Sequence, residues 1–283
     1  MVSPFQFARL PVIYFGCGKR SLLPGLISRY GSSVILVTGR KSFIESGNAS
    51  VLLESLRARD IVYHMVSVSG EPSPDLIDET VTRLRDAFPA AVVSIGGGSV
   101  VDAGKAISAM MRMPDSVKNY LEVVGTEEHP GTKIPFIAIP TTSGTGSEAT
   151  KNAVLSSVGS NGFKRSLRHD NFVPDIAVID PELTLECPRD ITSASGMDCF
   201  TQLIESFLSV KASVYTDAMA LAGLKSIKRS LLRSYAVGSD LEARTDMSFA
   251  ALTSGICLAN AGLGTVHGLA GTIGGLHDIP HGL

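Results

Sequence analysis

Residues 91–105 read AVVSIGGGSVVDAGK, and this run carries the clearest signal of the chain's architecture. Its first five residues are mostly apolar and β-branched, which predicts a buried strand that ends at Gly96. The glycines stand where that strand would turn into a helix. Glycine lets backbone N–H groups approach an anion, and a helix N-terminus adds a positive dipole. We therefore predict a diphosphate site at Gly96, Gly97, Gly98 and Ser99, although a tight turn that needs positive φ would give the same pattern.

Three further apolar runs define the rest of the predicted sheet. Strands are predicted at 34–38, 134–139 and 176–179, with amphipathic stretches between them. The stretch 74–88 predicts a helix with Ser73 as its N-cap and a proline at its first position. Strands that alternate with helices indicate an α/β domain with a doubly wound, mostly parallel sheet.

The pattern changes after residue 181. From about residue 190 onward it predicts helices only, at 195–210, 214–232 and 241–261. We therefore predict an α/β domain over residues 1–183, followed by an all-α domain over residues 184–283.

Composition excludes several classes of protein. The 283 residues are 44% hydrophobic with a net charge of −2, so a sizeable core is expected and a nucleic-acid partner is not. No apolar run reaches the roughly 18 residues of a membrane span, and the N-terminus lacks the pattern of a secretory signal. The four cysteines lie far apart, which argues against a disulfide framework and favours a cytoplasmic location.

A second loop rich in small polar residues follows the predicted strand 134–139. Residues 140–150 read PTTSGTGSEAT, with five hydroxyl side chains and two glycines before Glu148. In doubly wound folds the carboxyl ends of the strands form the ligand-binding edge. This position favours a role in binding over an ordinary polar surface loop.

The residues after strand 34–38 bear on the choice of cofactor. In many nucleotide-binding sheets an acidic residue there holds the adenosine ribose hydroxyls. This chain instead has Gly39, Arg40 and Lys41. A glycine followed by two cations would make room for a 2′-phosphate and attract it, but a solvated basic turn explains the same residues equally well.

Histidines near the end of the chain suggest a metal site. Asp198 and Gln202 are spaced i and i+4 on a predicted helix, so they share one face. His267, His277 and His281 lie in a glycine-rich run that holds three of the chain's six histidines. One carboxylate and two imidazoles suit Zn²⁺ or Fe²⁺ with a position open for substrate, whereas a lone histidine is more often structural.

These segments together resemble the iron-containing (group III) alcohol dehydrogenase family. The residues that carry the resemblance, in order along essentially the whole chain, are 15–18 (FGCG), 96–106, 140–150, 196–198 (GMD), 266–268 (VHG) and 280–282 (PHG). The resemblance implies a dinucleotide-binding α/β domain, then a helical metal-binding domain, with the active site in the cleft between them. It also implies hydride transfer between NAD(P) and an alcohol/aldehyde pair, Fe²⁺ or Zn²⁺, and a homodimer.

The resemblance assigns roles by position. It implies diphosphate binding by Gly97, Gly98 and Ser99, with Asp102 close by. The nicotinamide side would be lined by Thr141, Thr142 and Thr145, the ribose would lie near Asn152 and Lys164, and Leu183 would complete the cofactor site. The metal ligands would be Asp198, His267 and His281, and the first two would also take part in catalysis.

Three departures from the family pattern matter. The family's ribose-binding Asp corresponds to Gly39, which favours NADP over NAD. The family's His four residues after the Asp ligand is Gln202. Its amide oxygen is a candidate fourth metal ligand, but it is weaker and neutral, so a three-ligand, Zn²⁺-compatible site gains weight. A further His of many relatives corresponds to Gly271, which leaves His277 as the candidate for a proton relay.

Two alternative functions remain open at this point, and the length of the chain raises a separate question. The chain could be a nucleotide-binding relative with impaired metal chemistry, or a lyase of the dehydroquinate synthase type, for which Lys211 and Lys225 offer few phosphate ligands. Family members continue by roughly another hundred residues beyond the Pro-His-Gly motif, within ordinary domain sizes. The helical domain is therefore expected to be truncated, with His281 close to a chain end that would fray.

Overall fold

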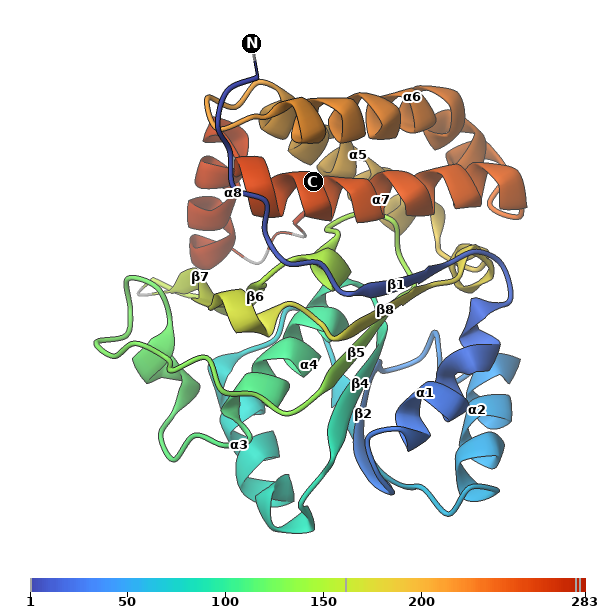
Figure 1. Cartoon of the computed structure of the whole chain (residues 1–283), viewed down its shortest axis with the longest axis vertical. Coiled ribbons are helices and arrows are strands. Elements are labelled where there is room, and N and C mark those ends of the chain that lie inside the picture. The colour runs from blue at the N-terminus through green and yellow to red at the C-terminus, as the bar shows by residue number, and fades with distance from the viewer. Residues whose placement is uncertain (1, 161, 278, 280) are drawn as a thin grey trace.

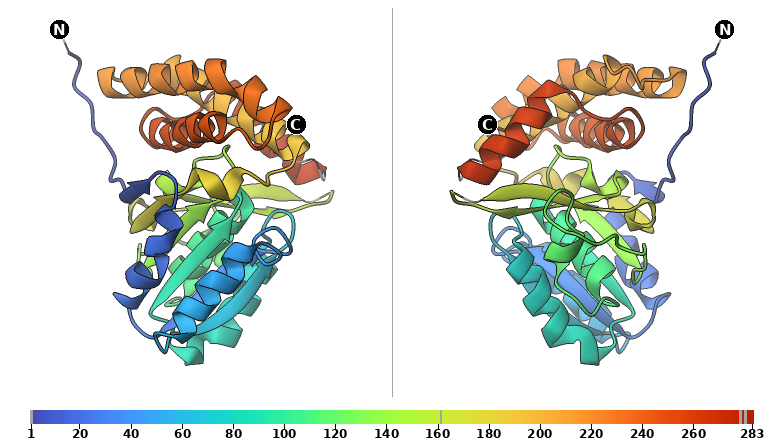
Figure 2. Two further views of the ribbon diagram at one scale, coloured as in Figure 1. Left: turned by 90° about the vertical axis from the view of Figure 1, so that its right-hand side faces the viewer. Right: turned by 90° about the vertical axis from the view of Figure 1, so that its left-hand side faces the viewer.

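The computed structural model describes residues 2–160, 162–277, 279 and 281–283. A parallel sheet with flanking helices forms one half of the molecule, and four helices form the other half (Figure 1). The two further views show the helical half stacked on one edge of the sheet half (Figure 2). The predicted order of an α/β domain followed by an all-α domain is confirmed.

Six parallel strands form the main sheet, in the order β1-β8-β5-β4-β2-β3. Their bounds are β1 Val12–Phe15, β2 Ser33–Gly39, β3 Val62–Val68, β4 Ala91–Gly96, β5 Phe136–Pro140 and β8 Ile176–Ile179. The strand order reverses between β2 and β4. In open α/β sheets the crevice outside the carboxyl ends at such a point is where ligands bind. Gly39 and Gly96 end those two strands, so the fold places both predicted cofactor segments at that crevice.

Both faces of the sheet are covered by helices, which explains the continuous apolar character of the central strands. Along β2, Ile35 and Val37 face one hydrophobic cluster while Val34 and Leu36 face the other, as the period of two requires. The helices of this half are α1 Leu23–Ser28, α2 Gly47–Arg57, α3 Pro74–Leu84 and α4 Gly98–Met110. Short 3₁₀ helices are η1 Lys19–Leu22, η2 Arg85–Ala87, η3 Val117–Tyr120, η4 Ser147–Ala149, η5 Asp170–Phe172 and η6 Pro181–Thr184.

The helical half is built from long helices around a small apolar core. Its helices are α5 Arg189–Phe207, α6 Val214–Ala236, α7 Leu241–Ala261 and α8 Thr265–Leu276. Leu203, Ile227 and Met247, from α5, α6 and α7, meet in this core. Helix α8 reaches back to the sheet half and packs on an antiparallel hairpin, β6 Asn152–Ser157 and β7 Phe163–Arg168.

Several elements differ from the sequence predictions, each for a physical reason. Strands β1 and β3 were not predicted, because they lie at the sheet edges and begin with exposed valines, Val12 and Val62. Helix α3 ends at Leu84 and continues as η2, and α5 begins at Arg189, directly after a proline. The predicted N-cap is confirmed, since the Ser73 side chain accepts a hydrogen bond from the Leu76 N–H.

The glycine-rich run that carries His267 is a helix, not the turn that its composition suggests. Helix α8 contains four glycines, and glycine disfavours an isolated helix. Two of them, Gly274 and Gly275, lie against β7: a β-carbon on Gly275 would come within 3.1 Å of the Phe163 and Lys164 backbone. The glycines therefore allow the close packing that holds this helix in place.

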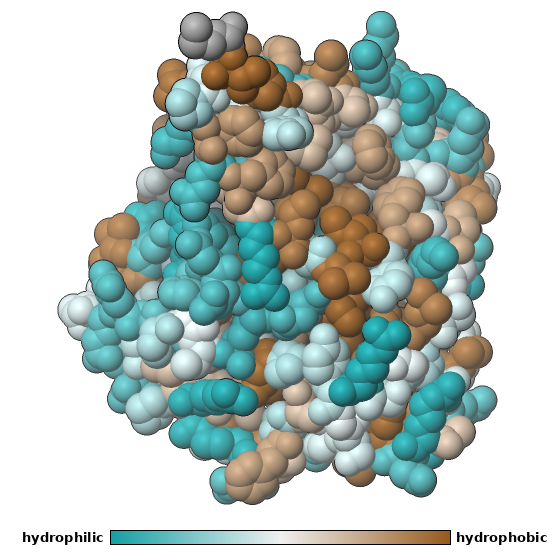
Figure 3. Space-filling view, viewed as in Figure 1, coloured by the Kyte–Doolittle hydropathy of each residue, from teal (hydrophilic) through white to brown (hydrophobic). Residues whose placement is uncertain are grey.

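Hydrophobic side chains on the face of Figure 1 form a patch near the middle, where the two halves meet, and hydrophilic ones predominate over the sheet half (Figure 3). Among the described residues, no single helix has both the length and the apolar composition of a membrane span. Helices α7 and α8 reach that threshold only as a pair, and they are bent by 100° at their junction.

Candidate active site

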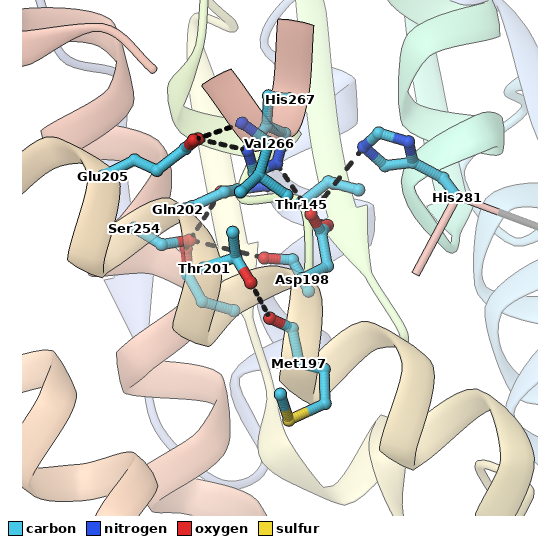
Figure 4. A network of polar contacts seen from close by, with 12 residues as sticks. Thr145, Met197, Asp198, Thr201, Gln202, Glu205, Ser254, Val266, His267 and His281 are labelled. Atoms are coloured by element: carbon cyan, nitrogen blue, oxygen red, sulfur yellow. Dashed lines mark hydrogen bonds and ion pairs between the residues drawn. The ribbon is translucent and has the colours of Figure 1, made fainter. Parts of the chain in front are cut away.

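Helix α5 presents three polar side chains from one face. Asp198, Gln202 and Glu205 are spaced i, i+4 and i+7, so they lie above one another on the helix surface. Asp198 and Glu205 both contact His267 of α8, and Gln202 lies between Asp198 and Ser254 of α7 (Figure 4). Asp198 and Gln202 are buried, at 7% and 2% exposure. Glu205 was not singled out from the sequence, although its i+7 spacing from Asp198 was a usable signal.

His267, in the first turn of α8, lies between two of these carboxylates. Its Nε2 is 3.1 Å from Asp198 Oδ1, and its Nδ1 is 2.6 Å from Glu205 Oε2. Burial opposes the charged imidazole, but the hydrogen bonds to Asp198 and Glu205 outweigh burial and raise the pKa of His267. The ring is therefore fixed at both nitrogens.

His281 completes a cluster of potential metal ligands. Its Nε2 lies 3.7 Å from Asp198 Oδ1, and its ring centroid is 5.7 Å from that of His267 (Figure 4). One ligand atom from each of the three residues lies within 4.8 Å of the others. Donors around a tetrahedral Zn²⁺ are about 3.3 Å apart, given metal–ligand distances near 2.0–2.1 Å. Two imidazoles and a carboxylate at these separations fit a divalent ion with one position open.

Gln202 is engaged at both ends of its amide. Its Nε2 donates to Asp198 Oδ2 at 3.1 Å, and its Oε1 accepts from the Ser254 hydroxyl at 3.0 Å. Because a carboxylate only accepts hydrogen bonds, the amide nitrogen must face Asp198. The amide oxygen, a candidate metal donor from the sequence, accepts the hydrogen bond of Ser254, and the amide nitrogen contacts Asp198, a candidate metal ligand.

A cavity of about 310 Å³ runs between the two halves beside this cluster. Gln202, His267 and His281 line it from the helical half. The sheet half contributes several predicted cofactor residues, namely Gly98, Ser99, Asp102, Thr145, Asn152 and Lys164. Apolar side chains also line it, among them Val154, Leu258 and Leu263. The fold therefore brings the predicted nucleotide loops and the predicted metal ligands to one cleft.

The two loops of the sheet half contact each other where they border the cleft. The Thr141 N–H donates to the Gly96 carbonyl at 2.9 Å, which joins the ends of β5 and β4. Gly97 lies against Thr142, and Gly98 lies against Thr145. Helix α4 begins at Gly98, so its free N–H groups are available at this point of the cleft.

Comparison with known proteins shows the family of the chain. The family model described as "Iron-containing alcohol dehydrogenase" matches residues 11–181, and the one described as "Fe-containing alcohol dehydrogenase family, C-terminal" matches residues 192–283. The chain belongs to the iron-containing alcohol dehydrogenase family.

Individual relatives agree with this assignment. The chain is 35% identical over 273 residues to long-chain-alcohol dehydrogenase 1 of Geobacillus thermodenitrificans, covering 96% of the chain and 68% of that relative. It is 32% identical over 271 residues to an NADPH-dependent butanol dehydrogenase of Clostridium saccharobutylicum, covering 95% and 68%. The solved structure of a sulfoacetaldehyde reductase from Bifidobacterium kashiwanohense in complex with NAD⁺ matches with a TM-score of 0.90 at 29% identity, covering 99% of this chain and 73% of that one.

Membership of the iron-containing alcohol dehydrogenase family defines the general activity. The enzyme is an NAD(P)-dependent oxidoreductase of small-molecule alcohols and aldehydes that uses a divalent metal. The alternatives of a non-catalytic relative and of a dehydroquinate synthase-like lyase are not favoured, because the family models and the relatives carry the names of dehydrogenases and reductases.

In this alcohol dehydrogenase a buried lysine links the two loops that are predicted to bind the nucleotide. Lys105 Nζ, on α4, donates to the Ser147 carbonyl at 2.8 Å and to the Thr150 hydroxyl at 3.0 Å. The Ser147 hydroxyl in turn donates to Asp102 Oδ1, and Lys105 lies 3.9 Å from that carboxylate. Burial lowers the pKa of Lys105 to about 8 and raises that of Asp102. Lys105 was not predicted as a site residue, although it stands in the quoted run 91–105.

The two residues expected near the nicotinamide ribose lie on the hairpin. Asn152 begins β6, and its carbonyl accepts a hydrogen bond from Lys105 Nζ at 2.6 Å. Lys164, on β7, forms an ion pair with Glu71, which also accepts from the Ser156 hydroxyl. Glu71 therefore holds the lysine at the cleft wall, a role that the sequence did not reveal.

The predicted adenosine end of the cofactor site lies at the ends of β2 and β4. Gly39 lies next to Val100 of α4, and a β-carbon there would meet only ordinary contacts, the nearest being Ser42 Oγ at 3.9 Å. Arg40 and Lys41 are exposed. Leu183 lines a separate cavity of about 360 Å³, whose wall also includes Ile95.

His277 lies apart from the residues that the fold brings together. It stands exposed at the C-terminal end of α8, where its N–H donates to the Ile273 carbonyl. It is absent from the described residues that line the cleft, whereas Gly271 lines it with open space around its α-carbon. Residue 271 faces the cleft, whereas residue 277 lies at the exposed end of the helix. The position of His277 thus does not support the predicted proton relay.

The loop after β5 also buries a carboxyl group that the sequence did not mark as special. Glu148 lies in η4, which packs against α7, and only 3% of it is exposed. Burial raises its pKa to about 7, while its own backbone N–H and the charge of Lys105 act in the opposite direction. A change in the charge of Glu148 near neutral pH is therefore expected.

Proposed function

We propose that Asp198, His267 and His281 bind the divalent metal of this alcohol dehydrogenase at the wall of the cleft between an α/β domain, residues 1–183, and a helical domain, residues 184–283. The observation that carries the proposal is the convergence of one donor atom from each of the three within 4.8 Å, beside a cavity lined by Gly98, Ser99 and Thr145. Nucleotide loops and metal-ligand chemistry meet at one cleft.

The roles of the chain's own residues follow from their places. When bound, the metal supplies Lewis acidity toward the alcohol oxygen, and NAD(P) supplies the hydride acceptor. The turn at Gly96–Ser99 and the N-terminus of α4 hold the diphosphate, and Thr141, Thr142 and Thr145 orient the nicotinamide. Asn152 and Lys164 hold the adjoining ribose, and Asp102 lies close to the diphosphate. Val154, Leu258 and Leu263 exclude water from the substrate's carbon chain.

Gln202 is proposed to support the metal site without ligating the ion. Its amide donates to Asp198 Oδ2, which leaves Oδ1, the oxygen nearer both histidines, free to bind. The amide oxygen is already bound to Ser254. Three protein ligands then leave a fourth coordination position for substrate, as in catalytic zinc sites.

NADP is proposed as the preferred cofactor. Gly39 leaves the space at the end of β2 without a carboxylate, and the exposed Arg40 and Lys41 follow directly. An acidic residue at such a position binds the 2′-hydroxyl of NAD, whereas a neighbouring cation accommodates the 2′-phosphate of NADP.

Assembly and location are also part of the proposal. Strand β1 lies at an edge of the sheet, and an edge strand can pair with that of a second copy. A homodimer is therefore proposed, to be tested by light scattering on the purified protein. A cytoplasmic location is proposed because the free cysteines of the structure show no disulfide framework.

The deciding experiment combines metal analysis with cofactor titration. The purified enzyme is expected to bind about one equivalent of Zn²⁺ or Fe²⁺, and to reduce NADP in the presence of an alcohol with a higher kcat/KM than NAD. Turnover that is unaffected by a strong chelator would contradict the metal site. Metal-dependent turnover with a clear preference for NAD would contradict only the assignment of Gly39, Arg40 and Lys41.

A further inference from the structure

Glu205 is not one of the proposed metal ligands, yet its carboxylate contacts one of them. One carboxylate oxygen, Oε1, accepts from the Val266 N–H at 2.8 Å, and the other, Oε2, lies 2.6 Å from His267 Nδ1. Both partners belong to the first turn of α8, while Glu205 belongs to α5. Its side chain is only 10% exposed. The carboxylate therefore spans two helices and uses both oxygens.

We propose that Glu205 is the positioning residue of the metal site: it holds the proton of the His267 imidazole on Nδ1 and so leaves the Nε2 lone pair for the metal. This inference rests on the proposed ligand set of Asp198, His267 and His281. A neutral imidazole carries one proton, and the partner of one nitrogen decides which nitrogen bears it. Both ring nitrogens face a carboxylate, Nδ1 facing Glu205 and Nε2 facing Asp198, and a carboxylate only accepts hydrogen bonds. When the metal is bound, Nε2 would be its ligand atom, so the single proton of the neutral imidazole would stay on Nδ1, where Glu205 accepts it.

The local sequence is adapted to this contact. Gly264 precedes α8, and a β-carbon there would come within 2.7 Å of Glu205 Oε1. The backbone N–H of Val266 fixes the carboxylate from one side, so the other oxygen is left in a defined position for the imidazole. Carboxylates that bind the far nitrogen of a metal-ligating histidine orient the ring and raise its basicity.

Replacing the carboxylate by an amide of the same shape separates this role from simple packing. A glutamine has one acceptor oxygen, and the Val266 N–H requires it. The amide NH₂ then faces His267 Nδ1, which must accept, so the imidazole proton moves to Nε2 and blocks the metal-binding lone pair. A residue that only fills space would tolerate this change.

The test is Glu205→Gln, with Zn²⁺ affinity measured by competition with a chromophoric chelator and Co²⁺ binding followed by its visible absorption. Zn²⁺ affinity is expected to fall about 10- to 100-fold, with a changed Co²⁺ spectrum. Asp246→Asn is the matched control, because Asp246 also accepts from two partners, Arg229 and Ser230, but lies between α6 and α7, outside the cleft lining. That variant is expected to bind Zn²⁺ as the wild type does.

A second variant guards against a folding defect. Gly264→Ala leaves every charge in place but pushes against Glu205, and it is expected to weaken Zn²⁺ binding in the same direction. Wild-type affinity in both Glu205→Gln and Gly264→Ala would overturn the role of Glu205 while leaving the ligand set intact. Retained Zn²⁺ binding in Asp198→Ala would instead overturn the ligand set, and this inference with it.

Discussion

Gly98 and Thr145 approach each other so closely that a β-carbon on the glycine would lie 2.7 Å from the threonine Oγ1. Gly98 begins α4 and Thr145 stands in the loop after β5, so this contact joins the two segments that border the cofactor side of the cleft. The absence of a side chain at residue 98 is therefore a requirement of tertiary packing. At Gly97 the corresponding distance to Thr142 is 3.4 Å, which is ordinary contact.

This difference predicts unequal effects of alanine at two adjacent glycines. Gly98→Ala should displace Thr145 and weaken NADP binding by about fivefold to 150-fold, if an overpacking cost of about 1–3 kcal/mol is paid in the bound state. Gly97→Ala serves as the matched control and should have a smaller effect. Dissociation constants measured by quenching or enhancement of NADPH fluorescence would show this order, and equal constants for the two variants would contradict it.

Asp198→Ala should abolish metal binding and metal-dependent turnover. The carboxylate contributes the only anionic donor of the proposed ligand set, and its loss should lower metal affinity by more than the roughly 100-fold that a supporting residue costs. Metal content after dialysis and alcohol-dependent formation of NADPH are the measurements. Asp190→Ala, an exposed change on the same helix, should retain both.

The end of β2 should control the choice between the two dinucleotides. Gly39→Asp should shift the ratio of kcat/KM values at least about tenfold toward NAD, since a carboxylate would bind the ribose hydroxyls and repel the 2′-phosphate. Arg40→Ala should raise KM for NADP about tenfold and leave KM for NAD nearly unchanged. Arg59→Ala, another exposed cation, is the control. If neither Gly39→Asp nor Arg40→Ala changed the ratio of the kcat/KM values for NADP and NAD, the end of β2 would not control the choice of cofactor.

Glu148 should make stability depend on pH below neutrality. Its pKa in the folded protein is about 7, above its ordinary value of 4.5, so the folded state holds the proton more tightly. This stabilisation is fully present below pH 4.5 and is lost as the pH rises through 7, an effect of up to about 3 kcal/mol.

Comparison of Glu148→Gln with the wild type isolates that contribution. As the pH rises from 5 to 8, the free energy of unfolding of the wild type should fall by more than that of Glu148→Gln. The glutamine at residue 148 cannot ionise, so the variant lacks this contribution. Urea denaturation at both pH values measures the difference. Glu79→Gln, an exposed change on α3, should follow the wild type, and a wild-type slope in Glu148→Gln would show that another group is responsible.

The sequence predicts some elements of the fold better than others. The central strands β2, β4 and β8 were predicted because helices cover both faces, which leaves a continuous apolar run in the sequence. Edge strands β1 and β3 lack that run. Helix α8 could not be predicted from its own residues, because its glycines oppose a helix and only contact with β7 compensates.

By itself, the sequence determined the architecture of an α/β domain followed by helices, the glycine turn at 96–99, and the choice of Asp198, His267 and His281 as candidate metal donors. Only the tertiary structure decided which of these residues meet. It placed His281 beside Asp198 and left His277 outside, bound the Gln202 amide to Ser254, and brought Glu205 to His267. The physical reason is that a local sequence pattern reports on burial and turn geometry. Contacts between residues 52 to 83 positions apart depend instead on how the helices pack, which no local pattern encodes.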